Sequence, residues 1–153
     1  MHRILTFCGL LMVIMVPLGC SLSSNDANSI GKVAQAWADS YFNFDYDKAE
    51  TLVTTDSHKW IAVAASNISE QDVDVIRSQE FAASASVQDV EWTEGSTQAW
   101  VSIEMKDVLV ADTIGRPMHA LSSAIYKICV VKSGNEWKVR MAGLPQNEMQ
   151  NRD

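Results

Sequence analysis

The spacing of apolar residues divides the chain into a helix-forming part and a strand-forming part. Between residues 29 and 84 apolar positions recur every three or four residues, whereas after Ser84 they recur every second residue. The first period is that of a helix with one buried face, and the second is that of a half-buried strand. The first helix is expected over residues 29–43, with Ser29 as its N-cap. Its apolar stripe consists of Ile30, Val33, Ala34, Trp37, Ala38 and Tyr41.

Polar residues that commonly cap helices predict where three shorter helices begin. Asp45 is expected to cap the second helix, and Thr55 or Asp56 the third. Ser69 and Asp72 have the spacing of a capping box, in which each residue bonds the backbone N–H of the other. They predict a short fourth helix.

Four strands are expected in the second half of the chain. They cover about residues 87–92, 98–110, 118–131 and 137–141, and short polar turns separate them. Helices followed by strands that are joined by tight turns indicate an α+β domain. Its antiparallel sheet, of three to five strands, is expected to pack its apolar face against the helices.

The amino terminus has the pattern of an export signal. A basic start is followed by about 15 almost wholly apolar residues, from Ile4 to Leu18. This run is shorter than the roughly 20 residues that a membrane span needs. It predicts a secretory signal peptide over residues 1–19. The alternative is a hydrophobic first helix of the folded domain, but the run lacks an amphipathic period.

The end of the apolar run, Pro17-Leu18-Gly19-Cys20, resembles the lipobox of bacterial lipoproteins. The resemblance implies cleavage before Cys20 and acylation of its sulfur and of the new amino terminus. Residues 20–29 would then be a flexible, lipid-anchored tether, and the protein would belong to the bacterial cell envelope. Ordinary signal cleavage near Ser21 is the other possibility, and it would release a freely secreted protein.

Charge and cysteine content narrow the function classes. The net charge is −7, and lysines and arginines are scattered singly, so the chain lacks the basic clusters that bind nucleic acid. Cys8 lies in the predicted signal, which leaves Cys129 as the one cysteine of the domain and rules out an internal disulfide. Cys129 is expected to pack as a small hydrophobic residue. No Cys-x-x-Cys or closely spaced histidine pair occurs, so no metal site and no cofactor are predicted.

The order of elements resembles a known family. A helix, the segment "FDYDKA", further helices and long strands that end in "GNEWKV" are similar to the cystatin-like, nuclear transport factor 2-like (NTF2-like) α+β cone. The resemblance covers about residues 30–144, and residues 145–153 are expected to form a flexible tail. It implies a strongly bent sheet wrapped around a long helix. The cavity between them is an active site in some relatives and a binding surface or a packed core in others.

Two functions follow from these expectations. The first is a lipid-anchored, non-catalytic domain that binds a ligand or a protein. The second is a small cone-fold enzyme of the isomerase or hydratase type. No catalytic residues are assigned, because no local motif aligns the acids, tyrosines or histidines of this chain with those of an enzyme. The residues expected at a pocket between helix and sheet are Trp37, Tyr41, His58 and Trp60.

The outward face of the second strand is the candidate interface. Trp100, Ser102 and Glu104 alternate with the apolar residues Val101, Ile103 and Met105. An exposed tryptophan on such a face indicates a covering partner or a homodimer that packs sheet on sheet.

Overall fold

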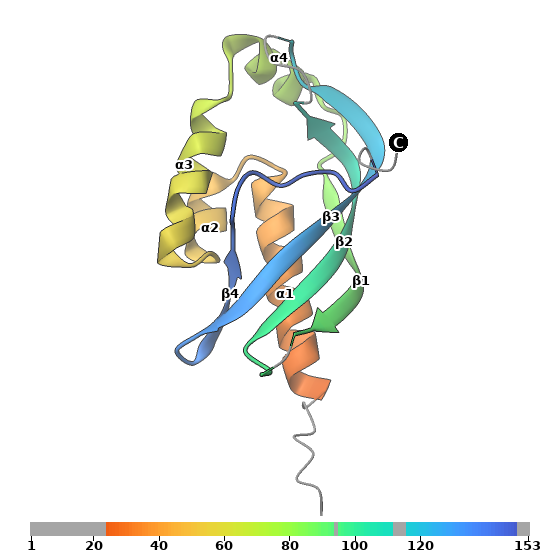
Figure 1. The fold of residues 1–153 in the computed structure, drawn as a ribbon. Coiled ribbons are helices and arrows are strands. Elements are labelled where there is room, and N and C mark those ends of the chain that lie inside the picture. Colours follow the sequence, from red (N-terminus) through yellow and green to blue (C-terminus); the bar gives the residue numbers. More distant parts are fainter. Residues whose placement is uncertain (1–23, 94, 112–115, 150–153) are drawn as a thin grey trace, which may run out of the picture.

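The computed structural model describes residues 24–93, 95–111 and 116–149, and it confirms the α+β prediction. Helices come first in the chain and strands follow, and the sheet wraps around the first helix (Figure 1). The elements are α1 (Ser24–Tyr41), α2 (Tyr46–Thr51), the 3₁₀ turn η1 (Thr55–Ser57), α3 (His58–Ser66), α4 (Glu70–Ser78), β1 (Ser84–Trp92), β2 (Gln98–Val110), β3 (His119–Ser133) and β4 (Glu136–Arg140).

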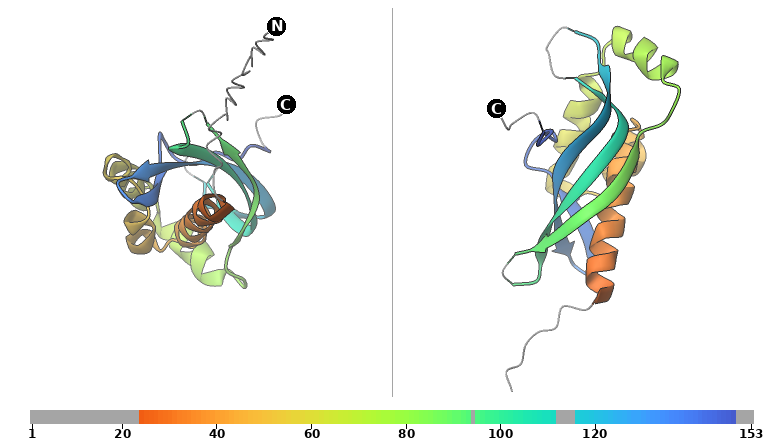
Figure 2. Two further views of the ribbon diagram at one scale, coloured as in Figure 1. Left: turned by 90° about the horizontal axis from the view of Figure 1, so that it is seen from below. Right: turned by 90° about the vertical axis from the view of Figure 1, so that its right-hand side faces the viewer.

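The sheet is a four-stranded antiparallel meander in the order β1-β2-β3-β4. Two irregularities coincide with its bending. The register of β1 shifts between Val87 and Asp89, and such a bulge increases local twist. In β2, Asp107 has a φ of 53°, a conformation that aspartate tolerates better than most residues. Seen end-on, the curved sheet partly encloses α1 (Figure 2).

The core lies between α1 and the concave face of the sheet. Trp37 is 1% exposed at its centre, and Ile30 and Ala34 on the same stripe are fully buried. The inward side chains of β2 meet them, as the period of two predicted. Removing these apolar surfaces from water is the main force that holds helix and sheet together.

Side chains of α1 cover the free edge of β1. Gln35, Asp39 and Asn43 lie one turn apart, and they bond the backbone of Ala83 and Ala85 at 2.8–3.0 Å. An unpaired edge strand would otherwise expose donors and acceptors to other chains. The polar side of α1 therefore fixes the helix along the sheet.

The first helix begins earlier than predicted. It starts at Ser24, and Ser29 lies inside it with its hydroxyl bonded to the carbonyl of Asn25 at 2.8 Å. Ser29 is therefore not the N-cap. The last six residues of the segment predicted as a tether, 24–29, are helical; their polar composition suits a solvent-exposed helical turn as well as a loop. Cys20 and the predicted signal peptide lie outside the described residues.

Two of the three predicted caps of the shorter helices are confirmed. Asp45 accepts a bond from the N–H of Lys48, and Ser69 and Asp72 form the reciprocal capping box. The third helix begins later than predicted, at His58 after the turn η1. A contact with a distant segment explains the later start. The hydroxyl of Ser57 bonds that of Thr54 at 2.7 Å and accepts the N–H of Met141 at 2.9 Å, which holds the residues before His58 in the turn η1.

An aromatic residue occupies the left-handed position that ends α1. The N–H of Phe44 bonds the carbonyl of Tyr41, and the N–H of Asp45 bonds that of Ser40, which is the Schellman pattern. Phe44 has a φ of 65°, where glycine is the usual choice. Strained residues of this kind gather at functional sites.

Residues 145–149 are not the loose tail that the sequence predicts from residue 145, and residues 150–153 of that predicted tail lie outside the described residues. Residues 141–148, here called the strap, cross from β4 to the edge of β3 (Figure 1). Asn147 is 8% exposed, and its side-chain oxygen accepts the N–H of Ile125 at 3.2 Å, while the N–H of Glu148 bonds the Ile125 carbonyl at 2.8 Å. The strap thus pairs with a strand edge that β4 is too short to reach.

Candidate functional site

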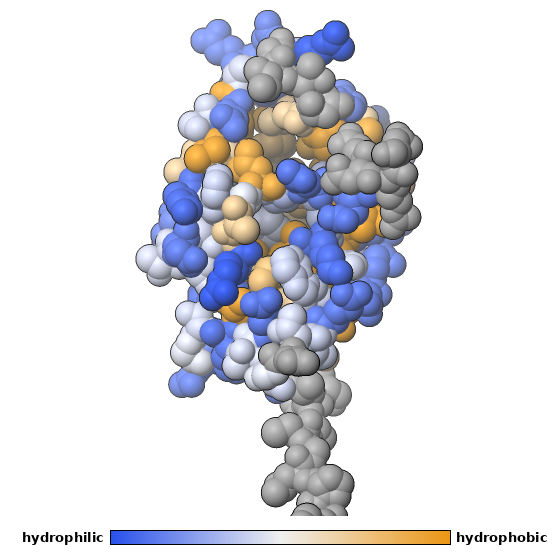
Figure 3. Space-filling view, in the orientation of Figure 1, coloured by the Kyte–Doolittle hydropathy of each residue, from blue (hydrophilic) through white to orange (hydrophobic). Residues whose placement is uncertain are grey.

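A cavity of about 490 Å³ opens above the strap and is called the upper cavity. It lies between the end of α1, α3, the bent part of β2 and β3, and the strap. Figure 3 shows the molecule from the same side as Figure 1, and its surface is hollowed near the upper end, with hydrophobic residues around the hollow. The lining residues are Tyr41, Phe42, Phe44, Tyr46, Ala64, Asn67, Leu109, Val110, Ala111, Met118, Tyr126, Leu144, Pro145, Gln146 and Asn147.

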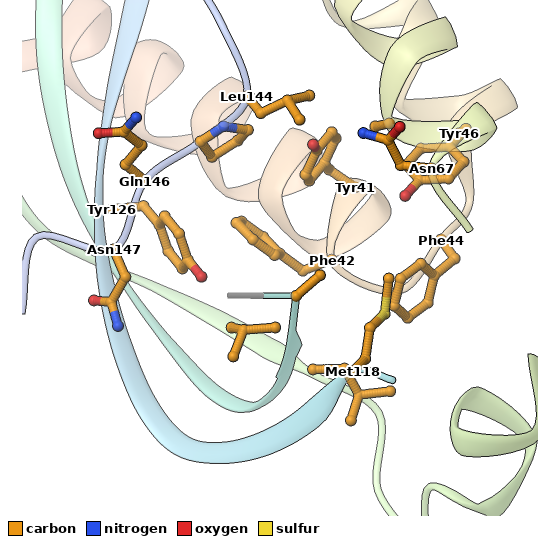
Figure 4. Close-up of a pocket in the computed structure, with 15 residues that line it drawn as sticks. Tyr41, Phe42, Phe44, Tyr46, Asn67, Met118, Tyr126, Leu144, Gln146 and Asn147 are labelled. Carbon is orange, nitrogen blue, oxygen red and sulfur yellow. The ribbon is translucent and has the colours of Figure 1, made fainter. Parts of the chain in front are cut away.

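Aromatic rings in contact form one wall of the upper cavity. Tyr41 packs against Phe42 and Tyr46 with ring centroids 5.1 and 5.6 Å apart, and Phe42 packs against Tyr126 at 4.4 Å. Figure 4 shows Tyr46 and Asn67 on one side of the cavity, Tyr126 and Asn147 on the other, and Phe42 between them. These contacts hold the rings in place, so the wall is largely pre-formed.

The three tyrosines of the chain all line this cavity. Burial raises the pKa of Tyr46 and of Tyr126 to about 12 each, and it raises that of Tyr41 further, with help from the other two tyrosines. No hydrogen bond within the described residues occupies their hydroxyl groups. At neutral pH they are uncharged groups that can donate to a ligand and accept from it.

The raised tyrosine pKa values predict a late alkaline titration. In the folded protein tyrosinate absorbance at 295 nm should rise with a midpoint near pH 12, whereas the denatured chain should titrate near pH 10. Because the folded pKa is the higher one, the associated stability is complete below pH 10 and is lost as the pH rises towards 12. A folded protein that titrates at pH 10 would show that the hydroxyl groups are fully hydrated.

A second cavity, of about 400 Å³, lies beyond the strap where β4 ends, and it is called the lower cavity. Its walls come from α1, from β2, β3 and β4, and from the strap itself. The residues that line it are Trp37, Gln98, Trp100, Lys127, Ile128, Cys129, Val139, Arg140, Met141, Ala142, Gly143, Leu144, Pro145, Gln146 and Glu148.

The four predicted pocket residues occupy different places. Tyr41 lines the upper cavity and Trp37 lines the lower one, with their rings stacked 4.8 Å apart. His58 and Trp60 line neither cavity. The Nδ1 atom of His58 lies 3.5 Å from a Glu50 carboxylate oxygen, and the Trp60 ring packs at the edge of the core with the Lys59 ammonium 5.3 Å from its centroid.

The three predicted interface residues on the outer face of β2 also have different surroundings. Trp100 is 36% exposed and lines the lower cavity. The Glu104 carboxylate accepts bonds from Ser123 at 3.0 Å and from Gln88 at 3.2 Å, so it is engaged within its own sheet. Ser102 lies half-buried between them. A homodimer or partner on this face stays a prediction.

Sequence reasoning missed several residues of the upper cavity. Tyr126 shares the inward face of β3 with Ala124 and Ile128, a parity that could have placed it there. No local sequence signal predicts Asn67, Met118 or Asn147 at the cavity, because turns and the strap, rather than a regular helix or strand, place them there.

Cysteine and possible metal ligands add no further site. Cys129 is half-buried on the outer face of β3 rather than in the core, and burial raises the pKa of its thiol. Strand parity explains the difference, since Ile128 and Val130 face inward. Within the described part of the chain, histidine, cysteine and acidic residues form no cluster that could hold a metal ion.

Comparison with known proteins bears on the fold. No protein-family model and no curated protein sequence matches the chain. Among solved structures it resembles a conserved protein from Planctomyces limnophilus DSM 3776, with 19% identity and a TM-score of 0.52 over 82% of this chain and 99% of that one. This likeness shows a shared fold.

NTF2-like proteins are also among the structures that it resembles, as the sequence resemblance implied. One is a protein of the NTF2-like family from Streptomyces avermitilis, with 11% identity, a TM-score of 0.45, and coverage of 75% of this chain and 91% of that one. Another is an NTF2-like protein involved in plasmid conjugation, with 12% identity and a TM-score of 0.41 over 81% and 49% of the two chains.

Proposed function

We propose that this domain binds a small molecule with a large apolar part in the upper cavity. The observation that carries the proposal is a pre-formed cavity of about 490 Å³ whose wall contains five aromatic side chains, including every tyrosine of the chain. Ligand pockets commonly have about 300–1,000 Å³ and combine apolar walls with a few polar groups. Here the tyrosine hydroxyls and three side-chain amides supply those groups.

The chemistry of the lining favours binding over proton transfer. All the described residues that line the upper cavity are uncharged at neutral pH. Raised pKa values keep the tyrosines as hydroxyl donors. An isomerase or hydratase needs a group whose pKa lies near the working pH. The titratable side chains among the described lining residues are tyrosines, whose pKa values are raised well above neutral pH. The enzyme therefore remains the second prediction.

A saturable thermal shift tests the binding proposal. We expect 1-decanol to bind in the upper cavity and to raise the melting temperature, because a ligand that binds only the folded state stabilises it. Ala64→Phe should lower its affinity at least tenfold by filling the cavity. Ala65→Phe adds the same ring on the exposed side of α3 and should bind decanol normally. Unsaturable decanol binding, or equal affinity of two folded variants, would refute the proposal.

We also propose that the protein is exported and anchored to the bacterial envelope through lipid on Cys20. The support is the sequence pattern that ends in Gly19-Cys20. No helix in the described part of the chain is long and apolar enough to cross a membrane. Helix α1 has 18 residues and is therefore about 27 Å long. Its first residue lies close to Cys20 in sequence, and Tyr41 at its far end lines the upper cavity, so the cavity would lie in the part of the domain that is farther from the membrane.

A pair of cysteine variants tests the anchor. In the full-length chain Cys20→Ala should move the protein out of the membrane fraction and remove the acyl mass from the amino-terminal peptide, because the sulfur is the proposed lipid acceptor. Cys8→Ala changes a cysteine inside the predicted signal and should leave both results as in the wild type. Unprocessed, unacylated wild-type chain in the cytosol would disprove the anchor.

A further inference from the structure

Two helices end at the upper cavity. Tyr41 is the last residue of α1, Asn67 directly follows the last residue of α3, and both line the cavity (Figure 4). The aligned peptide dipoles give the carboxyl end of a helix a partial negative charge, which favours a cation close to it. Neither helix has a basic residue in its last turn to compensate that charge. The two helix ends therefore make the cavity favourable for a positive group.

The aromatic wall of the upper cavity suits a cation for a separate reason. The face of an aromatic ring is electron-rich, and it attracts an ammonium group within about 6 Å of the ring centroid. Phe44 and Tyr46 of this wall are only half-buried, so a ligand can reach their rings. The attraction is stronger where water is partly excluded, as it is inside a cavity.

Acidic side chains adjoin the uncharged lining. Asp45 and Asp47 flank Tyr46 in the chain, and the Asp72 carboxylate accepts the N–H of Met118 at 2.8 Å. Helix α2 begins at Tyr46, and the carboxylate of Asp45 caps this end and offsets its partial positive charge. An anion in the cavity would therefore lie near carboxylates.

The basic residues close to the lining in sequence do not provide a counter-charge for an anion. Lys127 follows Tyr126 on β3, but it is exposed, and its ammonium lies 2.7 Å from the Glu91 carboxylate. Arg116 is exposed two residues before Met118 and is not among the described lining residues. The charges on and around the lining thus favour a cation over an anion.

We propose that the ligand of the upper cavity is an alkyl quaternary ammonium compound, whose cationic head lies between the aromatic wall and the ends of α1 and α3. This assignment rests on the proposed function, since the apolar part of the ligand occupies the same cavity. It goes further by giving the ligand a positive charge and by naming the features that select it.

Calorimetric titration of the full-length chain with decyltrimethylammonium, 1-decanol and decanoate tests the assignment. The three compounds have linear chains of the same length and differ in the charge of the head group. Neutral pH and about 0.15 M salt screen distant charges, and the concentrations stay below those that form micelles. The wild type should bind decyltrimethylammonium at least tenfold more tightly than decanol, and decanoate more weakly than decanol.

A pair of lysine variants separates local charge from net charge. Asn67→Lys places an ammonium at the end of α3, where the side chain is exposed, and it should remove most of the preference for decyltrimethylammonium over decanol. Asn135→Lys makes the same change in the exposed turn between β3 and β4, at the other end of the sheet (Figure 1), and should keep the preference.

A pair of leucine variants tests the aromatic wall. Phe44→Leu keeps an apolar side chain but removes a ring from the cavity, so it should weaken decyltrimethylammonium at least threefold more than decanol. Phe81→Leu makes the same change at a phenylalanine that is 64% exposed and is not among the lining residues, and it should leave both affinities unchanged.

The results distinguish the cation site from the proposed function. If the wild type binds decanol or decanoate as tightly as decyltrimethylammonium, the cation site is overturned and the upper cavity remains a ligand site. Failure of all three compounds to bind would refute the proposed function itself. A preference that Asn67→Lys leaves intact, or that both lysine variants reduce equally, would overturn the role of the helix ends.

Discussion

Replacing Trp37 by alanine is expected to lower the free energy of unfolding by about 3–5 kcal/mol. The indole is 1% exposed and lies where α1 meets the concave sheet, in contact with the rings of Tyr41 and Phe42. Its removal takes away the transfer free energy of a large ring and leaves a void that the rigid surroundings cannot close. Urea unfolding followed by circular dichroism measures the loss.

Trp100→Ala is the matched control, because it deletes the same side chain from the outer face, where 36% of it is exposed. This change should cost clearly less than Trp37→Ala, because about a third of the Trp100 side chain is already exposed to water. Equal losses for the two variants would contradict the placement of Trp37 in the core. Folded domains have free energies of unfolding of about 5–15 kcal/mol, so Trp37→Ala removes a large share of the stability. The unfolding of this variant should therefore be measured at low temperature.

Ser57→Ala is expected to cost about 1–3 kcal/mol, a large effect for the loss of one oxygen atom. Ser57 is fully buried, and its hydroxyl accepts the Met141 N–H and bonds the Thr54 hydroxyl. Alanine leaves both groups without this partner in a dry environment. The same bond fixes the start of the strap, so hydrogen exchange of the Met141 amide should accelerate together with the loss of stability.

Ser66→Ala serves as its control. The Ser66 hydroxyl is exposed at the end of α3 and bonds the Val63 carbonyl within the same helix. Water can replace this bond, so the change should stay within about 0.5 kcal/mol. Normal protection of the Met141 amide in Ser57→Ala would contradict the role assigned to the hydroxyl.

Local interactions made much of the fold predictable. The Ser69–Asp72 capping box and the Asp45 cap act within four residues, so they can be recognised in the sequence alone. The strand alternation of Val101, Ile103 and Met105 likewise follows from which face of β2 is buried. The resemblance to the cone fold predicts Tyr41 and Trp37 at a pocket, and in the structure Tyr41 lines the upper cavity and Trp37 the lower one.

Long-range contacts explain what the sequence could not predict. The delayed start of α3 depends on a bond between Ser57 and Met141, which are 84 residues apart. The sequence predicts a flexible tail from residue 145, but in the structure the Asn147 side chain bonds the edge of β3 at Ile125. His58 and Trp60 were expected at the pocket, but α3 directs Ala64 and Asn67 to it instead.

The sequence by itself determined the order of helices and strands, the buried faces of the first helix and of β2, and the candidate export signal, because these depend on residue period and on neighbours in the chain. Only the tertiary structure decided where the cavities lie, which tyrosines share one of them, and which donors remain unpaired. Those features arise where the end of α1, the bend of β2 and β3, and the strap converge, and no local pattern encodes such a meeting of distant segments.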